Sequence, residues 1–207
     1  MEPFRNEPVL ELRRASERAK LEDGMVAAAT RIPLRVPVLI GGDARHGDEL
    51  TSTDPGTPSR VVATSALATE AEVGEAVRTA DRAYASWSQR PAEERAAALV
   101  RAAAWMRERR HEIAALILRE AGKPWAEADA DVCEAIDFCE FYARGALALA
   151  QGKPLFQVPG ERNAMTYRPR GVTGVIAPWN FPAATMPIGI ATGKFQGETT
   201  ATTPRAA

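Results

Sequence analysis

Apolar residues recur at steps of three and four through the middle of the chain, and this period predicts amphipathic helices. The first helix is expected to begin at Thr69, because Glu72 three residues later completes a capping box. A second begins at Pro91, is interrupted at the basic cluster of residues 108–111, and stops at Gly122. The central part of the chain is therefore expected to be largely helical.

A third long helix is predicted to begin at Pro124. Four apolar residues form one stripe along it: Val132, Ile136, Cys139 and Ala143. Cys133 and Cys139 lie on or beside this stripe, so we expect both to pack rather than react. Glu134 and Asp137 are three residues apart and share a helix face. A solvated flank is the ordinary interpretation of such a pair, and acid–base chemistry is the alternative.

Shorter stretches have the composition of strands. Residues 35–42 and 60–66 are rich in β-branched residues and are separated by the turn-forming residues 52–59, so small antiparallel pieces are expected there. Residues 163–169 alternate apolar and polar positions, which is the period of a strand with one exposed face. Residues 1–35 are predicted to form an arm with a short amphipathic helix, whose apolar positions are Val9, Leu12, Ala15 and Ala19.

A buried strand is predicted at residues 171–177, where β-branched residues and glycines precede Pro178. Pro178 and Pro182 indicate a stiff turn at the end of this strand. Because ligands of open α/β sheets bind at the carboxyl ends of strands, Asn180 is poised to donate a side-chain hydrogen bond into a cleft. The alternative is a buried turn whose aromatic residues fill the core and whose asparagine caps a helix.

Composition and charge narrow the classes of function. The 207 residues carry a formal net charge of −1 without a basic stripe, which argues against nucleic acid as a partner. Two cysteines are too few for a disulfide framework and have no metal-ligating companions at useful spacing, so no metal site is expected. No apolar run reaches roughly 18 residues, so no membrane span is expected. The first residues lack the apolar core of a signal peptide, which predicts a cytoplasmic protein.

Two blocks of sequence carry a family resemblance. LREAGKPWAEADADVCEAIDFCEFYA (118–143) and YRPRGVTGVIAPWNFP (167–182) resemble successive blocks of the aldehyde dehydrogenase superfamily. FRNEPV (4–9) and ASWSQRPAEERAAALVRAAA (85–104) are similar to one branch, the L-glutamate γ-semialdehyde (1-pyrroline-5-carboxylate) dehydrogenases. The similarity extends over residues 4–192 and involves several motifs in family order.

The resemblance implies an α/β fold. It corresponds to the N-terminal part of the family's cofactor-binding domain, with long helices, small antiparallel strands and the first strand of an incomplete Rossmann-like parallel sheet. The expected parts are an N-terminal arm (1–35), the helical part with small strands (36–155), an oligomerisation strand (156–169), the first Rossmann-like strand with the Asn loop (170–192) and an aberrant polar tail (193–207).

The resemblance also implies roles for particular residues. Asn180 matches the amide that donates to the oxyanion of the thiohemiacetal, and Glu134 and Phe181 match residues of the substrate pocket. Four residues match positions that lie along the cofactor NAD: Ile176, Ala177, Pro178 and Trp179. The implied activity is NAD-dependent oxidation of L-glutamate γ-semialdehyde to L-glutamate, in a homo-oligomer formed through the strand at 163–169.

The chain departs from the family pattern after Gly193, where it reads KFQGETTATTPRAA. This polar stretch does not suit a buried parallel strand, and Lys194 is not in the context of the family's cofactor lysine. The family's nucleophilic cysteine and general-base glutamate lie downstream of the Asn loop and have no match here. We therefore expect a truncated or frame-shifted product that folds poorly or self-associates and does not oxidise aldehydes. Two alternatives remain: a related aldehyde dehydrogenase with another substrate, and a non-enzymatic module that pairs with an intact subunit.

Overall fold

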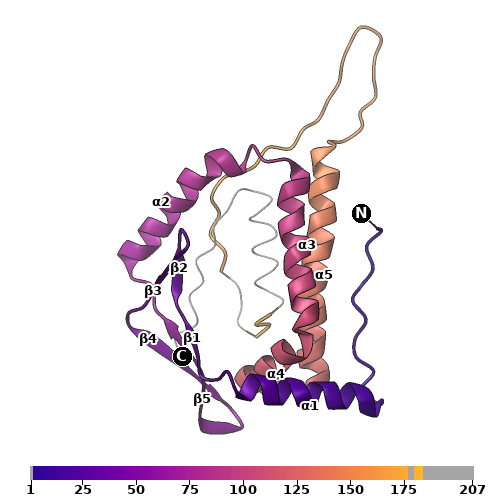
Figure 1. Cartoon of the computed structure of the whole chain (residues 1–207). Coiled ribbons are helices and arrows are strands. Elements are labelled where there is room, and N and C mark those ends of the chain that lie inside the picture. The colour runs from indigo at the N-terminus through magenta and orange to yellow at the C-terminus, as the bar shows by residue number, and fades with distance from the viewer. Residues whose placement is uncertain (1, 177–179, 184–207) are drawn as a thin grey trace.

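The computed structural model describes residues 2–176 and 180–183 (Figure 1). The helices are α1 (Ala15–Ala29), α2 (Glu70–Trp87), α3 (Ala92–Glu108), α4 (Arg110–Ala121) and α5 (Trp125–Ala150). The strands are β1 (Leu34–Val36), β2 (Val38–Ile40), β3 (Asp43–Arg45), β4 (Glu49–Asp54) and β5 (Thr57–Ala66). The described residues thus combine five helices with a small mixed sheet and a two-stranded ribbon, which confirms the α/β class.

The core lies between α3 and α5, which run side by side, while α4 crosses their ends and α1 lies along α4 (Figure 1). Val132 and Ile136 of α5 have no exposed surface, and Leu99 of α3 is 1% exposed. The other two members of the predicted stripe, Cys139 and Ala143, are also buried. The helical period therefore identified the buried face of α5 correctly.

The predicted helix ends are confirmed. The Glu72 backbone N–H donates to Thr69 Oγ1 at 3.3 Å and the Thr69 N–H donates to Glu72 Oε2 at 2.8 Å, which completes the capping box. Arg109 separates α3 from α4 within the basic cluster. Gly122 ends α4 with a φ of 65°, a left-handed conformation that glycine adopts without strain.

Two of the three described strand pairings are antiparallel as expected, β2 with β3 and β4 with β5, but the third is parallel. Residues 35–42 are not one strand, because Pro37 lacks a backbone donor and separates β1 from β2, which belong to different sheets. β1 pairs with β5 in parallel, with Leu34 opposite Ala63, while β4 pairs with β5 antiparallel. The parallel pair joins strands far apart in sequence, a pairing that local patterns do not reveal.

The N-terminal arm also differs from its prediction. Val9 and Leu12 precede the helix, which begins only at Ala15. The backbone N–H groups of Glu7 and Leu10 donate instead to carboxylates of α5, at 2.7 and 2.8 Å. These tertiary hydrogen bonds satisfy two backbone N–H groups that would bond within a helix if this segment were helical.

The two C-terminal strands are absent from the described residues. Residues 163–169 contain only an isolated bridge between Met165 and Lys153, and residues 171–176 form no strand. Ile176 is 97% exposed rather than buried. A buried parallel strand needs hydrogen-bonded neighbours, and no described strand pairs with 171–176. Residues 177–179 and 184–192, the remainder of the predicted strand and Asn loop, lie outside the described residues.

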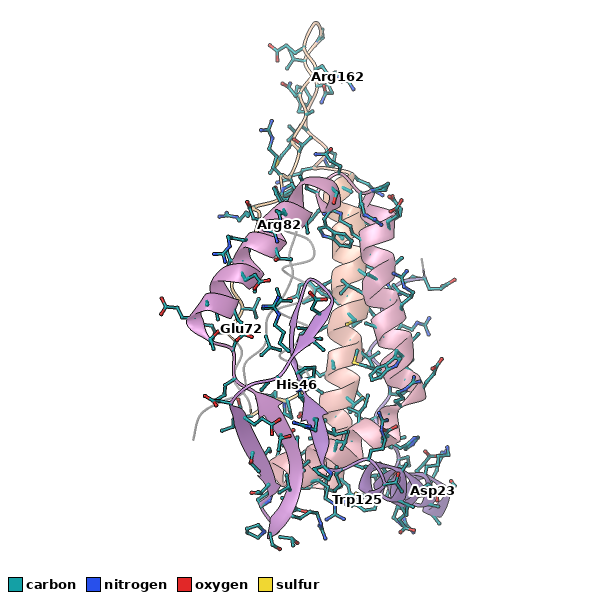
Figure 2. All side chains as sticks on the ribbon, turned by 60° about the vertical axis from the view of Figure 1, so that its left-hand side comes forward. Asp23, His46, Glu72, Arg82, Trp125 and Arg162 are labelled. Atoms are coloured by element: carbon teal, nitrogen blue, oxygen red, sulfur yellow. The ribbon has the colours of Figure 1, made fainter. Side chains whose placement is uncertain are left out.

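Residues 151–169 project from the end of α5, with Arg162 near the tip (Figure 2). We call this segment the projecting arm. Within the described part of the chain, no helix has the length and apolar character needed to cross a bilayer.

Gly24 permits close packing of α1 on α4. A Cβ at this position would lie 2.6 Å from the His111 carbonyl oxygen, a backbone atom that moves only with its helix. Gly24→Ala is therefore expected to lower the free energy of unfolding by about 1–3 kcal/mol, in spite of alanine's better helix propensity. Gly145→Ala in α5 is the matched control, because its Cβ would meet nothing within 4 Å, and it should raise stability by about 0.5–1 kcal/mol. Urea unfolding followed by circular dichroism measures both, and equal effects would contradict the close contact.

Candidate functional site

A groove of about 550 Å³ runs along the N-terminal half of α5. The residues that line it come from the N-terminal segment, from α5 with the turn before it, and from the turn at 180–183: Asn6, Glu7, Val9, Lys123, Glu127, Ala130, Asp131, Cys133, Glu134, Asp137 and Phe181. The groove therefore combines several carboxylates with one aromatic ring. It brings together both residues predicted to contact substrate, Glu134 and Phe181.

The two carboxylates that share a face of α5 have different surroundings. Asp137 accepts hydrogen bonds from Asn6 Nδ2 and from the Glu7 backbone N–H, both at 2.7 Å. Glu134 is exposed in the groove and has no hydrogen-bond or ion-pair partner among residues 2–176 and 180–183. Asp137 is thus occupied in holding the N-terminal segment, whereas Glu134 is available to a ligand.

The aromatic side of the groove is attached to α5 by Lys123. Its Nζ lies 4.3 Å from the centroid of the Phe181 ring and 2.7 Å from Asp131 Oδ2. A cation over an aromatic face is attracted by the ring quadrupole, and Asp131 fixes that cation in place. This arrangement holds Phe181 beside Glu134. Sequence reasoning did not select Lys123, because a lysine two residues before a helix carries no local signal of such a contact.

Asn180 lies next to Phe181 in the turn and is exposed, but it does not line the groove. Phe181 is also exposed, whereas Ala183 of the same turn packs against the core.

Neither cysteine has the properties of a nucleophile. Burial raises the pKa of the Cys133 thiol to about 12, so this thiol stays protonated near neutral pH. Cys139 is buried in the core. The prediction that both cysteines pack is confirmed by their burial.

Most of the predicted NAD site lies outside the described residues. Of the four residues predicted to lie along the cofactor, Ile176 is the one that the structure describes. It is 97% exposed and does not line the groove. Ala177, Pro178 and Trp179 lie outside the described residues. Among residues 2–176 and 180–183, no group of His, Cys, Asp and Glu side chains is suited to hold a metal ion.

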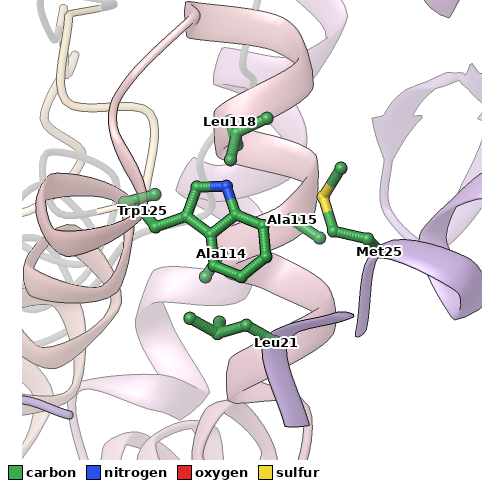
Figure 3. A pocket seen from close by; sticks show the side chains of 7 residues that line it. Leu21, Met25, Ala114, Ala115, Leu118 and Trp125 are labelled. Carbon is green, nitrogen blue, oxygen red and sulfur yellow. The ribbon is translucent and has the colours of Figure 1, made fainter. Parts of the chain in front are cut away.

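A second cavity, between α1, α4 and the start of α5, is too small for a ligand (Figure 3). Its volume is about 10 Å³, near the lower limit for a single water, and Leu21, Met25 and Trp125 contribute to its apolar lining. Figure 3 shows the Trp125 ring facing this space. The groove is therefore the better candidate site.

A buried ion pair between Arg110 and Asp129 also holds the N-terminal segment, and neither residue was selected from the sequence. Arg110 donates from Nε and Nη2 to the two oxygens of Asp129 at 2.6 and 2.8 Å, and Asp129 also accepts the Leu10 N–H. Glu7 pairs with Arg107 at 2.7 Å. Asp129 and Asp137 are eight residues apart, so they lie on one face of α5, and this spacing was the available signal.

The profile of the aldehyde dehydrogenase family matches residues 43–204. The 1-pyrroline-5-carboxylate dehydrogenase of Anoxybacillus flavithermus is 42% identical over 187 residues, which cover 90% of this chain and 36% of that protein. The chain thus spans little more than a third of the length of the curated relatives it matches.

Solved structures agree with the sequence matches. A Thermus 1-pyrroline-5-carboxylate dehydrogenase with bound NAD is similar with a TM-score of 0.90 and 39% identity, over 97% of this chain and 39% of that one. Proline utilization A from Bdellovibrio bacteriovorus is similar with a TM-score of 0.91 and 35% identity, over 96% of this chain and 21% of that one. These matches confirm the resemblance seen in the blocks at 118–143 and 167–182.

Proposed function

Because this chain belongs to the aldehyde dehydrogenase family, we propose that its groove forms part of a substrate pocket for L-glutamate γ-semialdehyde, which such an enzyme oxidises to L-glutamate with NAD. The observation that carries this proposal is the position of Glu134 and Phe181 in one groove, with Asn180 beside it. The names of relatives that act on 1-pyrroline-5-carboxylate support the same substrate class.

The chemistry of the groove suits an amino-acid aldehyde. The Glu134 carboxylate, which has no partner among residues 2–176 and 180–183, is an acceptor for a ligand ammonium group. A hydrogen bond between charged groups is about twice as strong as a neutral one. The Phe181 ring offers an apolar face to the aliphatic part of the ligand. Asn180, the neighbour of Phe181 in the chain, is proposed to donate its side-chain amide to an oxyanion, an interaction typically worth about 3–4 kcal/mol of barrier.

This chain by itself is proposed to bind without turnover. In the family chemistry a thiolate attacks the aldehyde, and the chain's two cysteines are both buried, with the Cys133 thiol held in its protonated form. The residues of the groove therefore bind and orient a ligand, and none of them supplies the nucleophile.

Binding of the stable product L-glutamate tests the proposed substrate class. Titration followed by NMR chemical shifts should show saturable binding, and Glu134→Gln should weaken it about tenfold or more, because a charge-assisted hydrogen bond is lost. Glu22→Gln on the exposed surface of α1 is the matched control and should leave the affinity unchanged. 2-Oxoglutarate, which lacks the ammonium group, should bind more weakly than L-glutamate. Equal affinities for wild type and Glu134→Gln, or rapid NADH formation from the aldehyde, would contradict the proposal.

We also propose that the projecting arm pairs with another copy of the chain or with an intact homologous subunit. Phe156 at 86% and Tyr167 at 50% exposure give this segment an apolar surface that faces solvent in the single chain. Phe156→Ser with Tyr167→Ser is expected to shift sedimentation from an associated species toward a monomer, while Phe141→Ser on α5 is the control at another exposed aromatic residue. A wild-type chain that sediments only as a monomer, alone and with a full-length homologue, would refute pairing.

A further inference from the structure

The N-terminal segment, residues 4–10, follows α5 in register. These residues form neither helix nor strand and contact α5 at three successive turns. The contacts are Leu10 N–H to Asp129 Oδ2 at 2.8 Å, Cys133 Sγ to the Pro8 carbonyl at 3.9 Å, and Asn6 Nδ2 to Asp137 Oδ2 at 2.7 Å. Two residues of extended chain span about 6.5 Å and four residues of helix about 6 Å. The segment and α5, which run antiparallel, therefore keep the same spacing between contacts.

Asp137 is the last of these three contacts, and beyond it the Phe4 ring packs against Phe141 with the ring centroids 5.5 Å apart. The two carboxylate oxygens of Asp137 accept one hydrogen bond each from consecutive residues, Asn6 and Glu7. Asn6 and Glu7, together with Val9, also line the groove opposite α5 and Phe181. The two hydrogen bonds to Asp137 therefore fix Asn6 and Glu7, and with them one wall of the groove.

We propose that Asp137 is a positioning residue that fastens residues 4–10 as one wall of the groove. Asp137 acts through Asn6 and Glu7 and does not itself have to contact a ligand. The role does not depend on the proposed function, because the wall has the same shape whatever molecule the groove takes.

Cys133 provides an internal reporter for this wall. The residue is 4% exposed, and its thiol donates a hydrogen bond to the Pro8 carbonyl at 3.9 Å. Release of the segment uncovers this thiol, whereas the rest of the helix, including Cys139 in the core, stays packed. The rate at which a thiol reagent modifies Cys133 therefore measures how often the wall opens.

The experiment uses the full chain carrying Cys139→Ser, so that Cys133 is the only thiol, with the reagent 5,5′-dithiobis(2-nitrobenzoate). Asp137→Ala should accelerate modification of Cys133 by about tenfold or more, because two hydrogen bonds to a charged acceptor are lost. Asp137→Asn retains one acceptor oxygen and should give an intermediate rate. Glu127→Ala is the matched control, since this α5 carboxylate lines the groove and makes no hydrogen bond or ion pair with residues 4–10, and it should leave the rate unchanged.

A second background, Cys133→Ser, separates local opening from unfolding. There the Asp137→Ala change should leave the slow modification of Cys139 unaltered. An unchanged rate at Cys133 would overturn the proposal. Equal acceleration at Cys133 and Cys139 would overturn it as well, because Asp137 would then stabilise the whole fold rather than the wall.

Discussion

Replacement of Arg110 by methionine is expected to lower the free energy of unfolding by about 3–5 kcal/mol, because it leaves the Asp129 carboxylate buried without its counter-charge. The Arg110 and Asp129 side chains are 9% and 2% exposed and are joined by two hydrogen bonds. Burial by itself would lower the pKa of Arg110, but the hydrogen bonds and charge of Asp129 outweigh it and raise that pKa. The guanidinium is therefore charged at every pH at which the protein folds.

Two further variants identify the cause of this loss. Arg90→Met removes an exposed pair, in which Arg90 and Glu94 are 3.4 Å apart, and should change stability by less than about 0.5 kcal/mol. The double change Arg110→Met with Asp129→Leu removes both buried charges and should recover much of the loss, because the uncompensated charge is gone. Urea unfolding of the three variants measures these differences. A double variant as unstable as Arg110→Met would show that lost packing, not buried charge, is the cause.

Replacement of Ile136 by alanine is expected to destabilise the fold by about 2–5 kcal/mol. Ile136 has no exposed surface and belongs to the core that α5 shares with Leu99 of α3. Removal of three carbon atoms loses the favourable free energy of burying them away from water. It also leaves a cavity that the neighbouring helices fill only in part.

Leu149→Ala in the same helix is the control for helix propensity. Leu149 is 43% exposed, so its truncation should cost less than about 1 kcal/mol. Thermal and urea unfolding of both variants provides the comparison. Similar losses at Ile136 and Leu149 would mean that α5 is not packed on α3 as the structure has it.

The helices could be predicted from sequence because their signals are local. The Thr69 capping box, the break at Arg109 and the end of α4 at Gly122 each depend on residues within a few positions of one another. The buried stripe of α5 follows from the 3.6-residue period in the same way. Predictions that required a partner strand were less successful. β1 proved parallel to β5, and residues 171–176 form no strand where no described strand pairs with them.

In the candidate site, too, some features could be predicted from sequence and others depend on distant contacts. Sequence resemblance selected Glu134 and Phe181, but it did not reveal that Lys123 holds Phe181 or that Asp137 holds the N-terminal segment. Sequence by itself determined the helices from α2 to α5, the buried face of α5 and the family that the chain resembles. Tertiary structure alone decided how the groove is walled, because Asn6 and Asp137 are 131 positions apart and no local pattern records a hydrogen bond across that distance.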